Sequence, residues 1–260
     1  MRDTLVENPK PQVIGAAPAG AAPAGARDEA QAAAQVREMF SSIAPRYDLL
    51  NHVLSMNVDR LWWNRTARVF EHILRNPDAR VLDLCCGTGD MTFALYRHAG
   101  EAKPKMVGAD FSAAMLERAR EKGAGKPIEW IEADALHMPF ANEEFDLVTS
   151  AFGFRNLANY DVGLREIYRV LRPNGEMGIL DFSEPKGMFG DLYRFYFKNI
   201  LPKIGTMISG VKGPYAYLPA SVERFPEPEE MLGRMRAAGF REVSWTRYSF
   251  GIAGLWRGKK

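Results

Sequence analysis

Cysteine is almost absent from this chain of 260 residues, which has only Cys85 and Cys86, side by side. Adjacent cysteines cannot form a disulfide framework, and a bridge between them would be strained, because disulfides need more widely spaced Cα atoms. Thiol exchange uses a C-x-x-C spacing, which the chain also lacks. We therefore expect two small buried side chains and a protein of the reducing cytoplasm.

Long apolar runs are missing as well, and none could span a bilayer. The first 15 residues contain Asp3, Glu7 and two prolines where a signal peptide would have its apolar region. Metal-ligand spacings of His, Cys and Asp are not found, so no metal site is predicted. A net charge of +2 is too small to indicate nucleic-acid binding.

The N-terminal part divides into two stretches of different composition. Residues 1–27 are rich in alanine, proline and glycine, which predicts a disordered, solvated tail without a function of its own. From Asp28 the apolar residues have helical spacing, with Val36, Phe40 and Ile43 on one face. We expect N-terminal helices over residues 28–78 that cover the main domain.

Residues 79–184 alternate short apolar runs with helical segments. This order is typical of right-handed βαβ units, in which both faces of a parallel sheet are covered by helices. Residues 226–260 begin with a helical pattern and end in two β-like runs broken at Gly251, which predicts a closing hairpin. The predicted fold is α/β, with a doubly wound, mostly parallel sheet.

An aromatic-rich insertion, residues 185–225, follows the fifth predicted strand and carries interspersed arginines and lysines. Two interpretations remain open. The aromatic residues could pack in the core, or the segment could be a lid over an apolar substrate, with one face on lipid headgroups.

The stretch "VLDLCCGTGD", residues 81–90, places two glycines where the first strand should end. It is not a P-loop, because no Gly-Lys-Ser/Thr follows Gly89, and it is a poor dinucleotide motif, because its third glycine would fall at Thr92. Gly87 and Gly89 nevertheless allow the backbone to approach a ligand closely at a helix N-terminus.

Two aspartates accompany the glycines. Asp83 lies on the first strand near its carboxyl end, and Asp110 ends the second apolar run, 21 residues after Gly89. A carboxylate at this position suits the two hydroxyl groups of a ribose.

These features, with "GADFSAAMLERAR" and "EADALHMPF", resemble the class I S-adenosylmethionine-dependent methyltransferases. "FSSIAPRYDLLN" (residues 40–51) and "FGFRN" (residues 152–156) are more specific, and are similar to motifs of the ubiquinone/menaquinone biosynthesis C-methyltransferases. The likeness runs from about Val36 to the C-terminus. It implies a Rossmann-like fold and S-adenosylmethionine as the cofactor.

The resemblance also implies roles for single residues. Thr88 would lie in the glycine loop around the methionine part of the cofactor, Asp110 would bind the ribose hydroxyls, and Asp134 and Ala135 would flank the adenine. Some members of the family have Ser where this chain has Ala151, many have His where it has Asp59, and the N-terminal tail has no counterpart.

Three residues are candidates for the chemistry. Methylating a ring carbon beside a phenolic hydroxyl requires that hydroxyl to lose its proton, and Arg155 could stabilise the phenolate or orient a water molecule that takes the proton. A surface arginine on a loop is the alternative. Tyr47 and Asn51 could reach over the pocket from the N-terminal helices, or could simply pack there.

The expected reaction is C-methylation of a demethylated prenyl hydroquinone, foremost demethylmenaquinol, with the ubiquinol precursor as a second acceptor. Such a substrate implies peripheral contact with the inner membrane face, and a homodimer is left open. Another small phenolic acceptor, a nucleic acid, and a cofactor-binding module without activity are the rival interpretations. The motif "SAFGFRN" and the small net charge disfavour nucleic acid.

Overall fold

One mixed sheet of seven strands organises the computed structural model, which describes residues 17–48, 55, 57–185, 190 and 214–260. The strand order is β3-β2-β1-β4-β5-β7-β6, and β7 runs antiparallel to the other six strands, which share one direction. The strands are β1 (Arg80–Leu84), β2 (Lys105–Asp110), β3 (Ile128–Glu132), β4 (Phe145–Ala151), β5 (Leu171–Phe182), β6 (Arg241–Tyr248) and β7 (Ala253–Lys259). The predicted doubly wound, mostly parallel sheet and its closing hairpin are confirmed.

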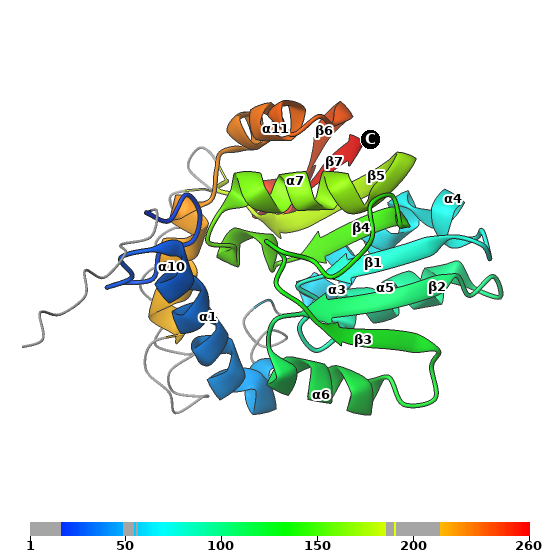
Figure 1. Ribbon diagram of the computed structural model, residues 1–260, viewed down its shortest axis with the longest axis horizontal. Helices are drawn as coiled ribbons and strands as arrows, with labels where there is room; N and C mark the ends of the chain where they lie inside the picture. The colour runs from blue at the N-terminus through cyan, green and yellow to red at the C-terminus, as the bar shows by residue number, and fades with distance from the viewer. Residues whose placement is uncertain (1–16, 49–54, 56, 186–189, 191–213) are drawn as a thin grey trace, which may run out of the picture.

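Helices connect the strands and cover the sheet (Figure 1). The α-helices are α1 (Glu29–Ile43), α3 (Val58–Val69), α4 (Glu71–Leu74), α5 (Asp90–Ala99), α6 (Ala113–Lys122), α7 (Tyr160–Val170), α10 (Pro214–Arg224) and α11 (Pro228–Ala237). Three short 3-10 helices join them: η1 (Ala44–Arg46), η2 (Phe154–Asn156) and η3 (Ser249–Gly251).

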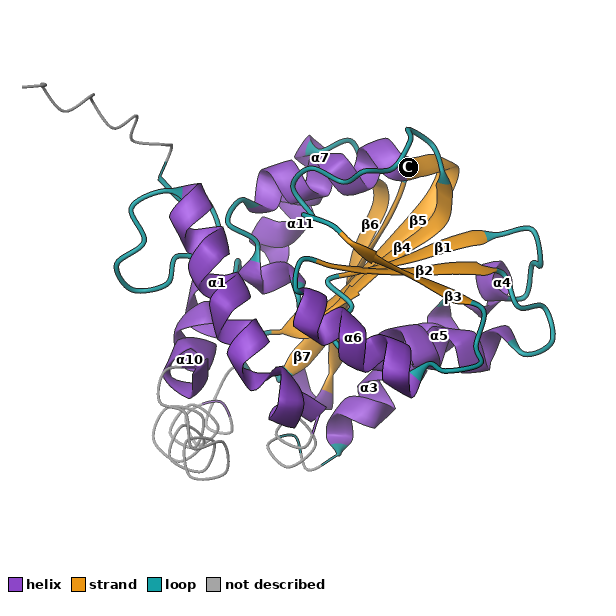
Figure 2. Ribbon diagram, turned by 60° about the horizontal axis from the view of Figure 1, so that its bottom comes forward, coloured by secondary structure: helices purple, strands orange, loops and turns teal. Residues whose placement is uncertain are grey.

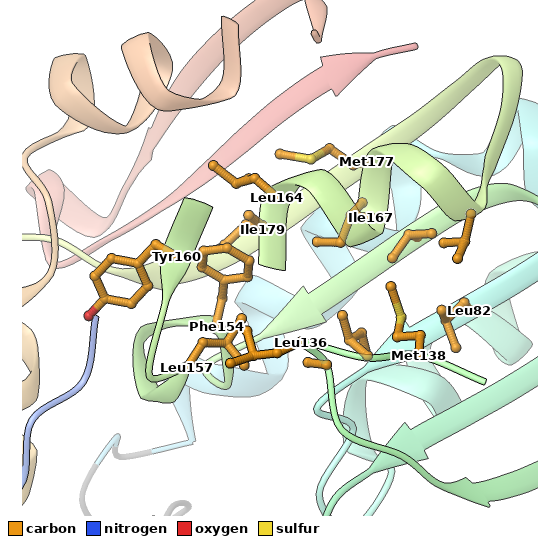
Figure 3. Close-up of a cluster of buried hydrophobic side chains, with 14 of the residues drawn as sticks. Leu82, Leu136, Met138, Phe154, Leu157, Tyr160, Leu164, Ile167, Met177 and Ile179 are labelled. Atoms are coloured by element: carbon orange, nitrogen blue, oxygen red, sulfur yellow. The ribbon is translucent and has the colours of Figure 1, made fainter. Parts of the chain in front are cut away.

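Alternate residues of each central strand point to opposite faces, so the sheet has two apolar layers. Leu82 packs with α7 and α11 on one face, in the cluster shown in Figure 3. Val81, its neighbour on β1, packs with α3 and α5 on the other face. Both layers are closed to water, which explains why the central strands are apolar on both sides.

Polar side chains define where several helices begin. Asp28, Ser112 and Asn159 each have extended backbone and accept a hydrogen bond from a backbone N–H in the first turn of the following helix. The helix predicted to begin at Asp28 is therefore confirmed. The helix α7 ends at Val170, because β5 already pairs with β4 from Leu171.

The helices α1 and α10 lie across the carboxyl ends of the parallel strands (Figure 1), and α1 also contacts α6, as Figure 2 shows. The helix α1 lies where the N-terminal cover is expected, and Phe40 of this helix lines the cavity at the strand ends. The helix α3, which also belongs to the predicted cover of residues 28–78, instead packs with α5 on one face of the sheet.

The predicted tail, residues 1–27, requires a correction. Residues 17–27 lie against the folded domain: Ala19 forms a parallel bridge with Asn159, and Gly20 and Ala21 are buried. Small side chains do not prevent packing here, because they allow close approach of two backbones. Residues 1–16 lie outside the described part.

Candidate active site

A cavity opens at the carboxyl ends of β1 and β4, neighbouring parallel strands whose chain connections run in opposite directions across the sheet. Ligands of open α/β sheets bind at such a switch point. The volume is about 440 Å³, within the range of small-molecule sites. The predicted site residues that line it are Tyr47, Asp83, Gly87, Thr88, Asp110, Asp134, Ala135 and Arg155.

The loop after β1 takes the left-handed backbone that its glycines permit. Gly87 has φ +55° and Gly89 has φ +89°. Gly87 borders the cavity, and a Cβ there would lie 3.8 Å from the Tyr47 ring. Gly89 instead precedes α5, where a Cβ would lie 2.7 Å from Trp130. This close approach lets α5 pack against β3, and the predicted contact of Gly89 with the cofactor stays a prediction.

Asp110 holds this glycine loop from the end of β2. One carboxylate oxygen accepts the backbone N–H of Gly87 at 2.9 Å, and the other accepts that of Ser112 at 2.9 Å. Burial raises the pKa of Asp110 to about 6, while the two N–H groups act in the opposite direction. The carboxylate thus joins two loops beneath the cavity.

Asp83 lies at the cavity floor and is clamped by two hydroxyl groups. Thr92 donates to one carboxylate oxygen at 2.6 Å and Thr149 to the other at 2.9 Å. Burial raises the pKa of Asp83 to about 7, because these two hydrogen bonds only partly compensate for lost hydration.

The raised pKa of Asp83 predicts a pH dependence of stability. The Asp83 carboxyl group ionises near pH 4 in the unfolded chain and near pH 7 in the folded one. Between these pH values the folded state binds more protons than the unfolded state, so the stability of the protein falls as pH rises. The Asp83→Asn variant should lose this dependence, gaining stability relative to the wild type as pH rises from 5 to 8. Urea unfolding across this range measures it.

The exposed Asp78 provides the matched control for that experiment. Asp78→Asn should leave the difference from the wild type constant with pH. A constant difference for Asp83→Asn as well would contradict the assigned burial effect.

Asp134 and Ala135 lie in the loop after β3. Asp134 accepts the backbone N–H of Leu136 at 2.9 Å, and the backbone N–H of Ala133 donates to the Asp110 carbonyl at 3.0 Å. These bonds place the loop beside the end of β2. The side chain of His137 in the same loop is 83% exposed, so this histidine points to solvent and takes no part in the cavity wall.

The N-terminal cover is fastened to the glycine loop by a lysine that sequence reasoning missed. Lys122, the last residue of α6, contacts Asp48 and Asp90 at 2.8 Å each and the Thr88 hydroxyl at 3.1 Å. Thr88 also donates to Asp48. A lysine at the end of an amphipathic helix carries no sequence signal for this role. Asn51, predicted to reach over the same region, lies outside the described residues.

Arg155 is only 5% exposed, which contradicts the alternative of a surface arginine. Its Nη1 donates to the Asp181 carboxylate at 2.8 Å and to the Phe152 carbonyl, and the guanidinium lies over the Phe182 ring. Its Nε–H is buried and has no acceptor among the described residues. Asp181 lies near the end of the fifth strand and is fully buried, and it holds Arg155, which lines the cavity, from behind.

Aromatic side chains build the wall beside Arg155. The rings of Phe152 and Phe182 are 4.7 Å apart, and Trp62 packs against both at 5.7 and 6.2 Å. The Trp62 indole N–H donates to the Ser249 hydroxyl at 2.8 Å, which joins α3 to the loop between β6 and β7. Sequence reasoning missed this wall, because its members are far apart in the chain.

The two cysteines follow β1 and line the cavity, and Cys85 is only half-buried, which differs from the expected pair of buried side chains. Cys86 is buried, and Cys85 takes φ +55° beside Gly153, where a Cβ would lie 2.3 Å from the Cys85 Cβ. Burial raises the pKa of both thiols well above the usual value, with the charge of Asp110 adding to it. Neither thiol is therefore activated as a nucleophile.

Among the described residues, no three His, Cys, Asp or Glu side chains are grouped so as to hold a metal ion. Within the same part of the chain, no helix has the length and hydrophobicity to cross a membrane.

Residues 28–260 match the sequence model of the ubiE/COQ5 methyltransferase family. The chain belongs to this family. Two relatives show how similar this methyltransferase is to named members. It is 49% identical over 240 residues to the demethylmenaquinone methyltransferase of Deinococcus radiodurans, covering 90% of this chain and 95% of that one. The demethylmenaquinone methyltransferase of Thermus thermophilus is 48% identical over 220 residues, covering 84% and 97%.

Solved structures agree on the fold of the methyltransferase. An S-adenosylmethionine-dependent methyltransferase from Thermotoga maritima superimposes with a TM-score of 0.61, covering 86% of this chain and 99% of that one. At 18% identity this likeness supports the Rossmann-like fold alone. The resemblance stated from the sequence motifs is thereby confirmed at the level of family and fold.

The predicted insertion, residues 185–225, is described only in part. Residues 186–189 and 191–213 lie outside the described residues, so the lid and core-packing interpretations stay predictions there. Its last helix, α10, is described, and Leu218 of this helix lines the cavity. This methyltransferase therefore uses at least the end of the insertion as a cavity wall.

Proposed function

We propose that this methyltransferase transfers a methyl group from S-adenosylmethionine to a ring carbon of demethylmenaquinol, a demethylated prenyl hydroquinone. The observation that carries the proposal is one cavity with two different halves. Acidic groups and the glycine loop form one half, and aromatic side chains with a buried arginine form the other. The names of the relatives support the choice of acceptor.

The residues of the first half fit the cofactor. The Asp110 carboxylate suits the ribose hydroxyls, the loop of Asp134 and Ala135 suits the adenine, and Gly87 and Thr88 suit the methionine part. When bound, the cofactor supplies a methyl group on a positively charged sulfur. The carboxylates of Asp83 and Asp110 favour such a cation, which in turn favours their ionised forms.

The second half fits an aromatic ring. The rings of Trp62, Phe152 and Phe182 provide an apolar surface, and aromatic pairs of this kind favour edge and offset contacts with a further ring. Tyr47 lies at the boundary over the glycine loop, where we propose that it separates the cavity from water. Asn51 remains a second candidate for this role.

Arg155 acts on the hydroxyl group of the acceptor in this proposal. A phenolate is a far stronger carbon nucleophile than a phenol, and a nearby guanidinium lowers the pKa of the hydroxyl by favouring the charged form. Asp181 accepts a hydrogen bond from one nitrogen of the guanidinium. The Nε–H has no hydrogen-bond partner among the described residues, and the phenolate oxygen of the substrate would provide one. Arginine stays protonated, so a water molecule takes the proton.

A prenylated acceptor remains anchored in the bilayer by its tail, so we also propose peripheral contact with the inner membrane face from the cytoplasm. The aromatic and basic residues of the insertion favour such contact. The domain boundaries proposed with this function are 28–78 for the cover, 79–184 for the cofactor core, 185–225 for the substrate insertion and 226–260 for the closing helix and hairpin.

The test uses the purified protein, S-adenosylmethionine with a labelled methyl group, and demethylmenaquinol with a short prenyl tail. We expect labelled menaquinol with the methyl group on the ring carbon, identified by mass spectrometry. The ubiquinol precursor and a phenol without a prenyl tail are the comparison acceptors. Methylation of the simple phenol alone would instead favour a methyltransferase for another small acceptor.

A further inference from the structure

The segment of residues 17–27, which we call the N-terminal strap, lies beside α1 and α10 (Figure 1, dark blue, left). The Ala21 N–H donates to the Leu157 carbonyl at 2.7 Å, and Ala19 bridges Asn159 in parallel. Ala21 is 2% exposed. The strap precedes the region that matches the family, which begins at residue 28.

Gly20 is where the strap comes closest to the fold. A Cβ at Gly20 would lie 2.2 Å from the Leu157 carbonyl oxygen and 2.9 Å from the Ala158 carbonyl carbon. Both atoms belong to backbone, which cannot rotate away as a flexible side chain could. The strap therefore depends on glycine for space, and any larger residue must displace it.

Two side-chain hydrogen bonds also hold this region, one to the strap and one to the start of α1. Arg224, the last residue of α10, donates from Nε to the Gly20 carbonyl at 2.7 Å. Asn159 donates to the Glu29 carboxylate at 2.9 Å while its own side-chain oxygen caps α7. The strap thus joins α10, the start of α7 and the start of α1.

The loop under the strap is the one that carries the acceptor residues. Residues 157–159 directly follow Arg155 and Asn156, which both line the cavity, and Leu157 lines it too. Figure 3 shows Phe154 and Leu157 of this loop beside Tyr160, whose hydroxyl donates to the Arg155 carbonyl. Asp181 holds the loop from the sheet side, and the strap holds it from the outside.

We propose that the N-terminal strap is a positioning element that keeps Arg155 and the α10 wall in place against the acceptor. The inference rests on the proposed function for its substrate. Within the described part of the chain, residues 17–27 bond within the strap and to α1, Leu157 and Arg224 and bridge Asn159, and none of these bonds goes to β1, β2 or β3. Loss of the strap should therefore loosen the acceptor half and spare the cofactor half.

The test compares three full-length variants and one truncation. Gly20→Val should displace the strap, and Ala21→Pro should remove its N–H donor with little change in size. Ala24→Val, at an exposed strap position, is the matched control. Deletion of residues 1–22 removes the contacts together.

We expect kcat/KM for demethylmenaquinol to fall roughly tenfold to a hundredfold in Gly20→Val and in the truncation, because small misplacements of a catalytic group have effects of this size. Ala21→Pro should show a smaller loss and Ala24→Val none. The dissociation constant for S-adenosylmethionine, measured by calorimetry, should stay within about twofold, in keeping with the separate cofactor half.

Hydrogen exchange gives a readout that needs no substrate. The amides of residues 153–160 and of α10 should exchange faster in the variants, while those of β1 and β2 should not. Unchanged exchange with unchanged kcat/KM would overturn the proposal, and so would a parallel loss of cofactor affinity. If the wild type does not methylate demethylmenaquinol, the proposed function fails, and the exchange rates still decide the role of the strap.

Discussion

Replacing Arg155 by alanine should reduce kcat by about 10²–10³-fold, the effect of removing one preorganised donor from an active site. Cofactor affinity should barely change, because Arg155 lies in the aromatic half of the cavity. Arg155→Lys should recover only part of the rate, since a single ammonium group cannot hold Asp181 and face the acceptor together. Single-turnover methyl transfer, with cofactor binding measured in parallel, gives the answer.

Because Arg155 is paired with the buried Asp181, the Arg155→Ala experiment needs a further control. Without the guanidinium, Asp181 remains as a charge with no exposed surface, and breaking a buried pair costs about 3–5 kcal/mol of stability. The double variant Arg155→Met, Asp181→Asn removes both charges and should recover much of the stability without recovering the rate. Near-normal transfer in either variant would exclude Arg155 from the mechanism and leave Tyr47 as the next candidate.

Asp110→Ala should weaken S-adenosylmethionine binding at least tenfold. Hydrogen bonds to a charged group contribute about 1.5–3 kcal/mol each, and about 1.4 kcal/mol corresponds to a tenfold change in affinity. The variant also frees the backbone N–H of Gly87, so the glycine loop loses its anchor. The loss should therefore exceed that of a ribose contact alone.

Calorimetric titration with the cofactor measures this loss, and Glu132→Ala is the matched control. Glu132 ends β3 as Asp110 ends β2, but it is exposed and does not line the cavity. Its variant should bind the cofactor as the wild type does. An unchanged dissociation constant in a folded Asp110→Ala protein would show that this carboxylate does not contact the cofactor.

Local patterns account for the parts of this protein that could be predicted. The alternation of apolar runs and helical segments predicts the sheet, and the positions of Asp83, Gly87 and Asp110 at strand ends predict that they meet. This works because the carboxyl ends of parallel strands share one edge of a sheet, so chain position determines spatial position.

The Ala/Pro-rich N-terminus shows where such reasoning fails. Composition indicates how much apolar surface a segment can bury by itself, and by that measure residues 17–27 should stay unfolded. The strap is instead stabilised by backbone groups, and Gly20 fits closely against the carbonyl of Leu157, which is far away in the chain. No local pattern contains that information.

By itself, the sequence determined the family, the order of strands and helices, and the residues of the glycine-loop end of the cavity, because each depends on residues close together in the chain. Only the tertiary structure decided that Arg155 is buried against Asp181, that Lys122 fastens the cover to the glycine loop, and that Trp62, Phe152 and Phe182 form one wall. These contacts join separate elements, and their energies depend on burial and distance, which exist only once the chain has folded.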